Sequence, residues 1–143
     1  MKFEKLKELV DNDLTLQKDK LDWESLRTPT LHNKYLKELM NARRQLAEQT
    51  MIYDKLYKER WEFYSGKADP KVYDKEPFGL KLMKDQIKIY LAADDKLQAQ
   101  SYKMKHLELK IEFLVKICED ITRRSFHITN AIKFLKFKMG ELD

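Results

Sequence analysis

The residues between Lys55 and Lys71 combine two kinds of side chain that together can bind an extended anionic polymer. Cations alternate with aromatic rings in the sequence KLYKERWEFYSGKADPK. These residues are the basic Lys55, Lys58, Arg60, Lys67 and Lys71 and the aromatic Tyr57, Trp61, Phe63 and Tyr64. Single-stranded nucleic acid binds to cations along its phosphates and to flat side chains that stack on its bases, at about 1–3 kcal/mol per stack. The segment therefore predicts a single-stranded nucleic-acid site.

The same segment also fits an ordinary helix surface. Trp61 and Phe63 could pack in the core, and the basic side chains could pair with Glu59 and Glu62 on a solvated face. The pattern alone leaves both interpretations open. Two further basic pairs, Arg43-Arg44 and Arg123-Arg124, are interpreted as surface charge.

Residue types that carry out catalysis do not occur in a recognised arrangement. His32, His106 and His127 are far apart in sequence, and Cys118 is the single cysteine, so the sequence contains no known zinc-binding spacing. The three glycines stand at the ends of expected elements and form no phosphate-binding loop. We therefore expect a protein that is not an enzyme and that has no metal or other cofactor.

The composition indicates long helices. Among 143 residues there are three glycines and three prolines, while 37% of the residues are charged. Such a chain is typical of an all-α protein. The net charge of +5 is moderately basic, and a single cysteine fits a reducing compartment. With no signal peptide and no apolar stretch of membrane-spanning length, the sequence predicts a soluble cytosolic protein.

Amphipathic spacing and turn residues predict the elements that position the candidate site. A short helix is expected over residues 2–11, and a long one from Thr28-Pro29 to Tyr64, where Ser65-Gly66 ends it. A short turn that carries Leu21, Trp23 and Leu26 is expected between these two helices. Arg60 is the discordant cation in an otherwise largely apolar series along the long helix.

The second half of the chain begins with a loop and then becomes helical again. Residues 67–79 contain two prolines and a glycine among charges and are expected to form a loop. A third helix is expected from near Leu80, with a bend or restart at Asp94-Asp95. We divide the chain into a DNA-binding region 1–66, a charged loop 67–79 and an oligomerisation region 80–143.

A 4-3 repeat dominates the C-terminal stretch from Leu97 to Met139. The repeat consists of Leu107, Ile111, Leu114, Cys118, Ile121, Ser125, Ile128, Ile132, Leu135 and Met139. Such spacing keeps one apolar stripe on the same side of a helix and favours association between helices. Apolar residues outside the stripe favour a broad oligomerisation surface. This surface is formed either by one helix or by two helices separated by a break near Ser125. The basic tail 133–138 could lie on a membrane, but burial against another protomer fits the stripe better.

The segment from Lys58 to Lys67, KERWEFYSGK, resembles the Lys-x-Arg-x-x-x-Tyr-Ser-Gly-basic stretch of the UvsY family. That family comprises the recombination mediators of T-even-type phages. The order of an N-terminal amphipathic helix, a charged loop, an Ala-Asp element at Ala93-Asp94 and a long C-terminal helix is similar as well. The resemblance covers nearly the whole chain.

The resemblance implies an all-helical, non-enzymatic protein that forms a ring-like homo-oligomer through its C-terminal part. It also implies binding to single-stranded DNA and loading of a phage recombinase onto strands covered by single-stranded DNA-binding protein, in the cytoplasm of the infected bacterial host. By this resemblance Lys58 and Arg60 fall on the family's DNA-contacting pair, Tyr64 matches its helix end, and Lys67 stands where the family has arginine. Trp61 and Phe63 depart from the family pattern.

These considerations define the sites that we expect. The DNA-binding residues are Lys55, Lys58, Arg60, Trp61, Tyr64 and Lys67, and the oligomerisation residues are Leu107, Ile111, Leu114, Cys118, Ile121, Ile128, Ile132, Leu135 and Met139. The alternative is a helical adaptor or phage-assembly scaffold that does not bind DNA, which the heptads fit equally well.

Overall fold

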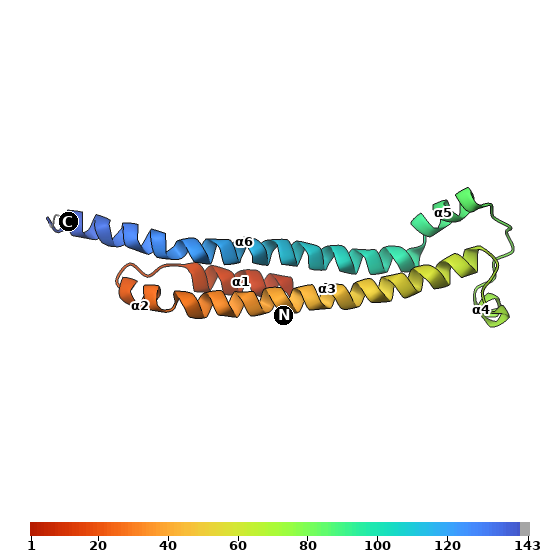
Figure 1. The fold of residues 1–143 in the computed structure, drawn as a ribbon, viewed down its shortest axis with the longest axis horizontal. Coiled ribbons are helices and arrows are strands. Elements are labelled where there is room, and N and C mark those ends of the chain that lie inside the picture. The colour runs from red at the N-terminus through yellow and green to blue at the C-terminus, as the bar shows by residue number, and fades with distance from the viewer. Residues whose placement is uncertain (141–143) are drawn as a thin grey trace. The chain divides into compact units, whose positions relative to one another are not determined.

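The computed structural model describes residues 1–140 and confirms the all-α class, because this part of the chain contains six helices and no strand (Figure 1). The helices are α1 (Phe3–Leu14), α2 (Leu21–Leu26), α3 (Thr28–Tyr64), α4 (Pro70–Lys75), α5 (Lys84–Ala92) and α6 (Asp95–Lys138). None of the helices within residues 1–140 contains an apolar run that could span a lipid bilayer. The chain forms two compact units, Met1–Ala42 with Leu109–Asp143, and Arg43–Glu108.

Unit 1 contains α1, α2, the beginning of α3 and the C-terminal part of α6. In Figure 1, α1 lies along both long helices. The buried apolar core of unit 1 consists of Leu6, Val10, Leu31, Tyr35, Leu39, Ala42, Leu114, Ile117 and Ile121. On each of α1, α3 and α6 these residues recur at helical spacing and so lie on one apolar face. The three apolar faces pack against one another and are thereby removed from water.

A buried charge cluster joins α2 to α6 in unit 1. Glu24 is fully buried, and its Oε1 lies 2.7 Å from Nε of Arg27 and 3.0 Å from Nη2 of Arg124. Arg124 also donates to the Glu24 carbonyl at 2.7 Å. The interpretation of Arg124 as surface charge is therefore wrong. Its position three residues after Ile121 and four before Ile128 puts it on the buried side of α6.

Unit 2 contains the rest of α3, the short α4, α5 and the N-terminal part of α6. Its buried apolar core consists of Phe63, Tyr64, Ile87, Leu91 and Leu97, with Tyr73, Phe78 and Leu82 packed against it. This core settles the alternative left open for Phe63, which is only 3% exposed and is a core residue.

The helix end at Ser65-Gly66 is confirmed. Gly66 has φ +77°, and its N–H donates to the Phe63 carbonyl while the Lys67 N–H donates to the Glu62 carbonyl. These two bonds form a Schellman motif, which satisfies carbonyls that the end of a helix leaves without partners.

Two local expectations are corrected and one open alternative is settled. Residues 67–79 are not all loop, because Asp69 accepts the Lys71 N–H at 2.9 Å and starts α4 with Pro70 in its first turn. The third helix starts at Lys84 rather than near Leu80. The alternative of one helix or two near Ser125 is settled in favour of one, since α6 is continuous from Asp95 to Lys138 and hydroxyls such as that of Thr129 donate to carbonyls within it.

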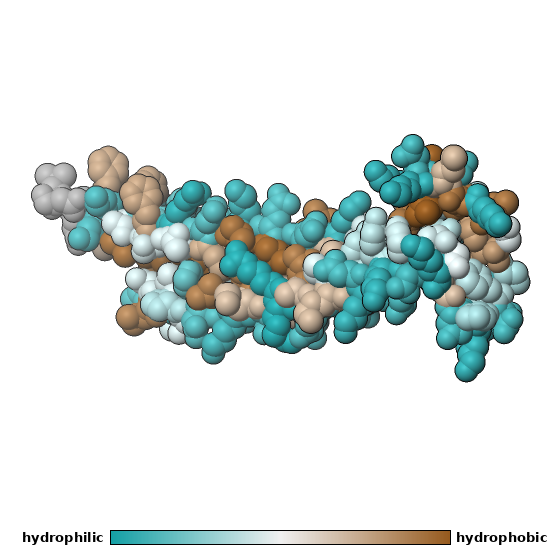
Figure 2. Space-filling model, turned by 45° about the vertical axis from the view of Figure 1, so that its right-hand side comes forward, coloured by the Kyte–Doolittle hydropathy of each residue, from teal (hydrophilic) through white to brown (hydrophobic). Residues whose placement is uncertain are grey.

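The 4-3 stripe lies partly in the core of its own chain. Leu114 and Ile121 are core residues of unit 1, with Ile111 and Cys118 packed against them. Ile128 is also buried and Leu107 is half-buried. In contrast, the last stripe residues are exposed, at 37% for Ile132, 40% for Leu135 and 73% for Met139. Figure 2 shows hydrophobic side chains protruding in this C-terminal part of α6.

The functional division into regions 1–66, 67–79 and 80–143 stays a prediction. The two compact units describe how the chain packs, not where it binds DNA or another protomer.

Candidate nucleic-acid interface

One group of predicted site residues lies on an exposed face of α3 in unit 2. We call Lys55, Tyr57, Lys58, Trp61 and Lys67 the outer surface. All five are exposed, with Tyr57 at 42% and Trp61 at 38%. Lys58, Trp61 and Lys55 are spaced by three residues, so they are neighbours on the helix surface. The outer surface therefore brings exposed cations and exposed aromatic rings together.

The Schellman motif at Gly66 brings Lys67 back to this face. The Nζ of Lys67 lies 5.0 Å from the centroid of the Trp61 ring, within the range of a cation–π contact. Lys58 is 79% exposed, and its contact with Glu62 at 3.8 Å is a long, solvent-screened ion pair. Both lysines therefore remain accessible to an anion.

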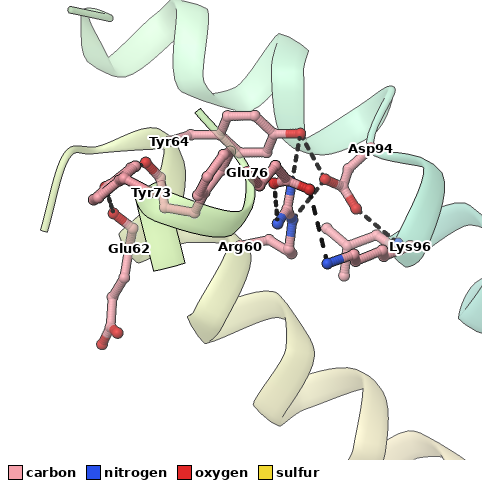
Figure 3. Close-up of polar contacts among 9 residues, drawn as sticks. Arg60, Glu62, Tyr64, Tyr73, Glu76, Asp94 and Lys96 are labelled. Carbon is pink, nitrogen blue, oxygen red and sulfur yellow. Dashed lines mark hydrogen bonds and ion pairs between the residues drawn. The ribbon is translucent and has the colours of Figure 1, made fainter. Parts of the chain in front are cut away.

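Arg60 faces away from Lys58 on α3 and belongs to what we call the Arg60 network: Arg60, Tyr64, Glu76, Asp94 and Lys96. Figure 3 shows the carboxylates of Glu76 and Asp94 and the hydroxyl of Tyr64 around the guanidinium. Its Nε donates to Asp94 at 2.7 Å and its Nη1 to Glu76 at 2.8 Å. The Arg60 side chain is 9% exposed and that of Asp94 is 2% exposed. Arg60 therefore holds α3, the end of α4 and the start of α6 together within unit 2.

Asp94 is held in its charged form. Burial by itself would raise the pKa of this carboxyl, but hydrogen bonds from Tyr64, from the Leu97 backbone and from Arg60 outweigh it and lower the pKa below its ordinary value. The Tyr64 hydroxyl donates to Asp94 at 2.5 Å. The Leu97 N–H also donates to Asp94, at 2.9 Å, so the Asp94 side chain caps the N-terminus of α6. Burial and the hydrogen bond from Tyr64 to Asp94 together raise the pKa of the Tyr64 hydroxyl.

Aromatic rings support the network from one side. Phe63 stacks on Tyr73 with centroids 5.3 Å apart, and Tyr64 contacts Phe78 and Tyr90 at 5.4 and 5.6 Å. Tyr73 also donates to the Phe63 carbonyl at 2.8 Å, at the end of α3. These contacts fix the direction in which the chain leaves α3, and so the position of Lys67.

A cavity of about 420 Å³ opens beside the Arg60 network. It is lined by Arg60, Glu76, Asp94, Lys96 and the rings of Phe63, Tyr64, Phe78 and Tyr90, among others. Sequence reasoning did not identify Glu76 or Lys96. The signal available for Asp94 was its place before α6, and for Arg60 its place in the buried-face series of α3.

The predicted site residues thus form two groups. Lys55, Lys58, Trp61 and Lys67 lie on the outer surface, whereas Arg60 and Tyr64 are buried, at 7% and 8% exposure. Among residues 1–140 no cluster of three or more metal-ligating side chains is found.

A family model described as "Recombination, repair and ssDNA binding protein UvsY" matches residues 9–141. This chain belongs to the UvsY family. The match spans the outer surface, the Arg60 network and the long C-terminal helix, so the resemblance noted at KERWEFYSGK extends to nearly the whole chain.

Solved UvsY structures have the same fold. Two crystal structures of the bacteriophage T4 recombination mediator protein UvsY, in lattice types II and I, superpose with TM-scores of 0.84 and 0.83. The identities are 21% and 20%, over 97% and 94% of this chain and 98% of each UvsY chain. A search of curated protein sequences finds no match. At such identities the superposition establishes the fold, and residue roles need their own argument.

Proposed function

We propose that this protein is a recombination mediator that binds single-stranded DNA as a ring-like homo-oligomer. In this role it promotes loading of a phage recombinase onto strands covered by single-stranded DNA-binding protein, in the cytoplasm of the infected host, and it catalyses no reaction. The observation that carries the proposal is the outer surface, where the exposed Lys58 and Lys67 flank the exposed ring of Trp61 in a chain of the UvsY family.

The outer surface suits a strand of any sequence. Lys58 and Lys67 provide ammonium groups for phosphates, and the rings of Trp61 and Tyr57 provide faces for bases. Stacking needs no particular base, so it supports binding along a strand rather than at one sequence. One copy offers few phosphate contacts, which makes its affinity weak and strongly dependent on salt.

Assembly would make such weak sites effective. A strand bound at one copy reaches the next copy at high effective concentration, and the whole assembly then binds far more tightly than one copy. A curved array of sites would hold the strand in an extended path, loosen the single-stranded DNA-binding protein and present the strand to recombinase.

The C-terminal end of α6 is the surface that best supports assembly. Ile132, Leu135 and Met139 continue the stripe of Ile121 and Ile128, but their own chain does not bury them. The earlier stripe residues Leu107, Ile111, Leu114 and Cys118 are wholly or partly covered within the chain. Their contact with another protomer stays a prediction, and the exposed end of the stripe carries the proposal.

Fluorescence anisotropy of labelled oligonucleotides tests the proposal. We expect binding that strengthens with oligonucleotide length and weakens steeply as salt rises, with little preference for sequence. Trp61→Ala should weaken binding, and Trp23→Ala, which removes an exposed indole of unit 1, serves as the matched control. Absence of length-dependent binding at low salt would contradict the proposal and favour the adaptor or scaffold.

A further inference from the structure

Glu76 holds two cations of the Arg60 network at once. Its Oε2 lies 2.8 Å from Nη1 of Arg60, and its Oε1 lies 3.8 Å from Nζ of Lys96 (Figure 3). Each carboxylate oxygen thus faces a different cation. One phosphate of a nucleic acid, with two free oxygens and the same charge, can make the same pair of contacts.

Glu76 is held less firmly than Asp94, the other carboxylate on Arg60. Asp94 is 2% exposed and also accepts from Tyr64 and from the Leu97 backbone, so it is fixed in place. The Glu76 side chain is 42% exposed, and it stands just after the six-residue α4, before Pro77. Its release would expose one N–H edge of Arg60 while Asp94 still holds the other.

The space for a ligand adjoins these groups. The cavity of about 420 Å³ is lined by Glu76, Arg60 and Lys96, and also by Tyr90, which is 37% exposed. Two cations and an accessible ring are what a nucleotide unit of a single strand requires. None of the five residues of the outer surface lines this cavity, so it is a separate place of contact.

We propose that Glu76 stands in for a DNA phosphate, and that a phosphodiester of single-stranded DNA displaces it to bind Arg60 and Lys96. The inference rests on the proposed function, that the protein binds single-stranded DNA. An anion replaces an anion, so the buried guanidinium keeps its charge balance throughout. The exchange makes contact with Arg60 conditional on moving Glu76, whereas Lys58 is accessible from the start.

Glu76→Gln tests the exchange, with Asp74→Asn as its control. Asp74 is exposed on α4, two residues before Glu76, and among residues 1–140 it contacts no cation, so both variants lose one negative charge in the same region. Removing a half-exposed ion pair should tighten binding of an oligothymidylate about fivefold at low salt. The salt slope should stay close to that of the unmodified protein, because the same phosphate contact forms in both and Glu76→Gln only removes its competitor.

Lys96→Gln in the Glu76→Gln background should abolish that gain. Lys103→Gln in the same background removes an exposed lysine elsewhere on α6 and should leave the gain intact. Glu76→Asp keeps the charge but shortens its reach, and it should also bind more tightly than the unmodified protein. Far-ultraviolet circular dichroism checks that each variant keeps its helices.

Two results would overturn the inference: equal affinities for Glu76→Gln and Asp74→Asn, or a gain that survives Lys96→Gln. In both cases the unmodified protein still binds the oligonucleotide, and the proposed function stands. Absence of binding by the unmodified protein is a different result, which removes the proposed function and this inference with it.

Discussion

Lys58 and Arg60 are two residues apart on α3 and face opposite sides of it. Lys58 is 79% exposed on the outer surface, whereas the Arg60 side chain is 9% exposed and paired with Asp94 and Glu76. Two positions correspond to about 200° around an α-helix, so adjacent cations in the motif cannot share one face. Lys58 should therefore contribute to DNA binding without contributing to stability, whereas Arg60 should contribute to stability and contact DNA only where a phosphate displaces Glu76.

Lys58→Ala should weaken DNA binding without changing stability. It removes one exposed phosphate contact, so the salt slope should fall by about one while the urea-unfolding midpoint stays constant. Lys88→Ala, an exposed lysine on α5, is the control for loss of charge. A Lys58→Ala variant with unchanged affinity at low salt would remove Lys58 from the site.

Arg60→Ala should instead destabilise the protein. It leaves Asp94 charged and buried without its cation, and breaking a buried pair in this way costs about 3 kcal/mol. Urea unfolding measures the loss directly. A variant with unmodified stability would contradict the placement of Arg60 within unit 2.

Much of the fold follows from local sequence signals. The helix start at Thr28-Pro29, the helix end at Gly66 and the restart at Asp94 were predicted because proline in the first turn of a helix, glycine after it and aspartate before it act within one turn. The short α4 also had a local signal, since Asp69-Pro70 is an N-cap followed by proline. The helix itself was not predicted, because the six residues of α4 contain too few apolar positions to show a helical period.

The candidate site was only partly predictable, because the network depends on pairs far apart in sequence. Arg60 was singled out as a cation in an apolar series, but its partners Glu76 and Asp94 lie 16 and 34 residues away. The charge pattern of a sequence shows where a cation is. It does not show whether a carboxylate from a distant part of the chain pairs with that cation in the folded protein. For the same reason the buried pair of Arg124 with Glu24, 100 residues apart, was mistaken for surface charge.

Gly66→Ala and Gly79→Ala should have opposite effects on the free energy of unfolding. A Cβ added at either position meets nothing within 4 Å, so a steric clash does not distinguish the two substitutions. Gly66 has φ +77°, where an L-residue costs about 1–2 kcal/mol. Gly79 lacks a positive φ, so alanine there should stabilise by about 0.4–1 kcal/mol through the unfolded chain. Urea unfolding measures both, and equal changes would contradict the left-handed helix end.

Acid should destabilise the protein through carboxyls whose pKa is lowered on folding. Burial alone would raise the pKa values of Asp94, Glu24 and Asp13, but their hydrogen bonds and neighbouring cations lower them below the ordinary 3.8 for aspartate and 4.5 for glutamate. The unfolded chain then takes up protons first as the pH falls. The stabilisation is complete above those ordinary values and is lost as the pH drops through the folded-state pKa values.

Urea unfolding between pH 7 and pH 3 measures this loss. Asp94→Asn should be less stable at pH 7 and should lose less stability on acidification, because one of the responsible carboxyls is absent. Asp74→Asn, which removes an exposed carboxyl on α4, should follow the unmodified curve. Parallel curves for Asp94→Asn and the unmodified protein would contradict the charged state assigned to Asp94.

The double substitution Ile132→Asp and Leu135→Asp should prevent assembly while leaving the protomer folded. Both side chains are more than a third exposed within the chain, so charge there costs little in the protomer, but it would be buried without a partner between protomers. His127→Asp with Asn130→Asp adds two acids at exposed positions off the stripe and is the matched control. Native mass spectrometry should show a reduced mass for the first variant only, and equal loss in both would contradict a contact confined to the stripe.

The same variant separates assembly from DNA contact. Its outer surface is unchanged, so a single copy should still bind a short oligonucleotide with the weak affinity of one site. Binding to a long strand should fall about a hundredfold, because avidity comes from linking sites rather than from new contacts. Anisotropy titrations with a short and a long oligonucleotide measure the two affinities. If the variant bound the long strand as tightly as the unmodified protein, assembly would not be what makes the outer surface effective.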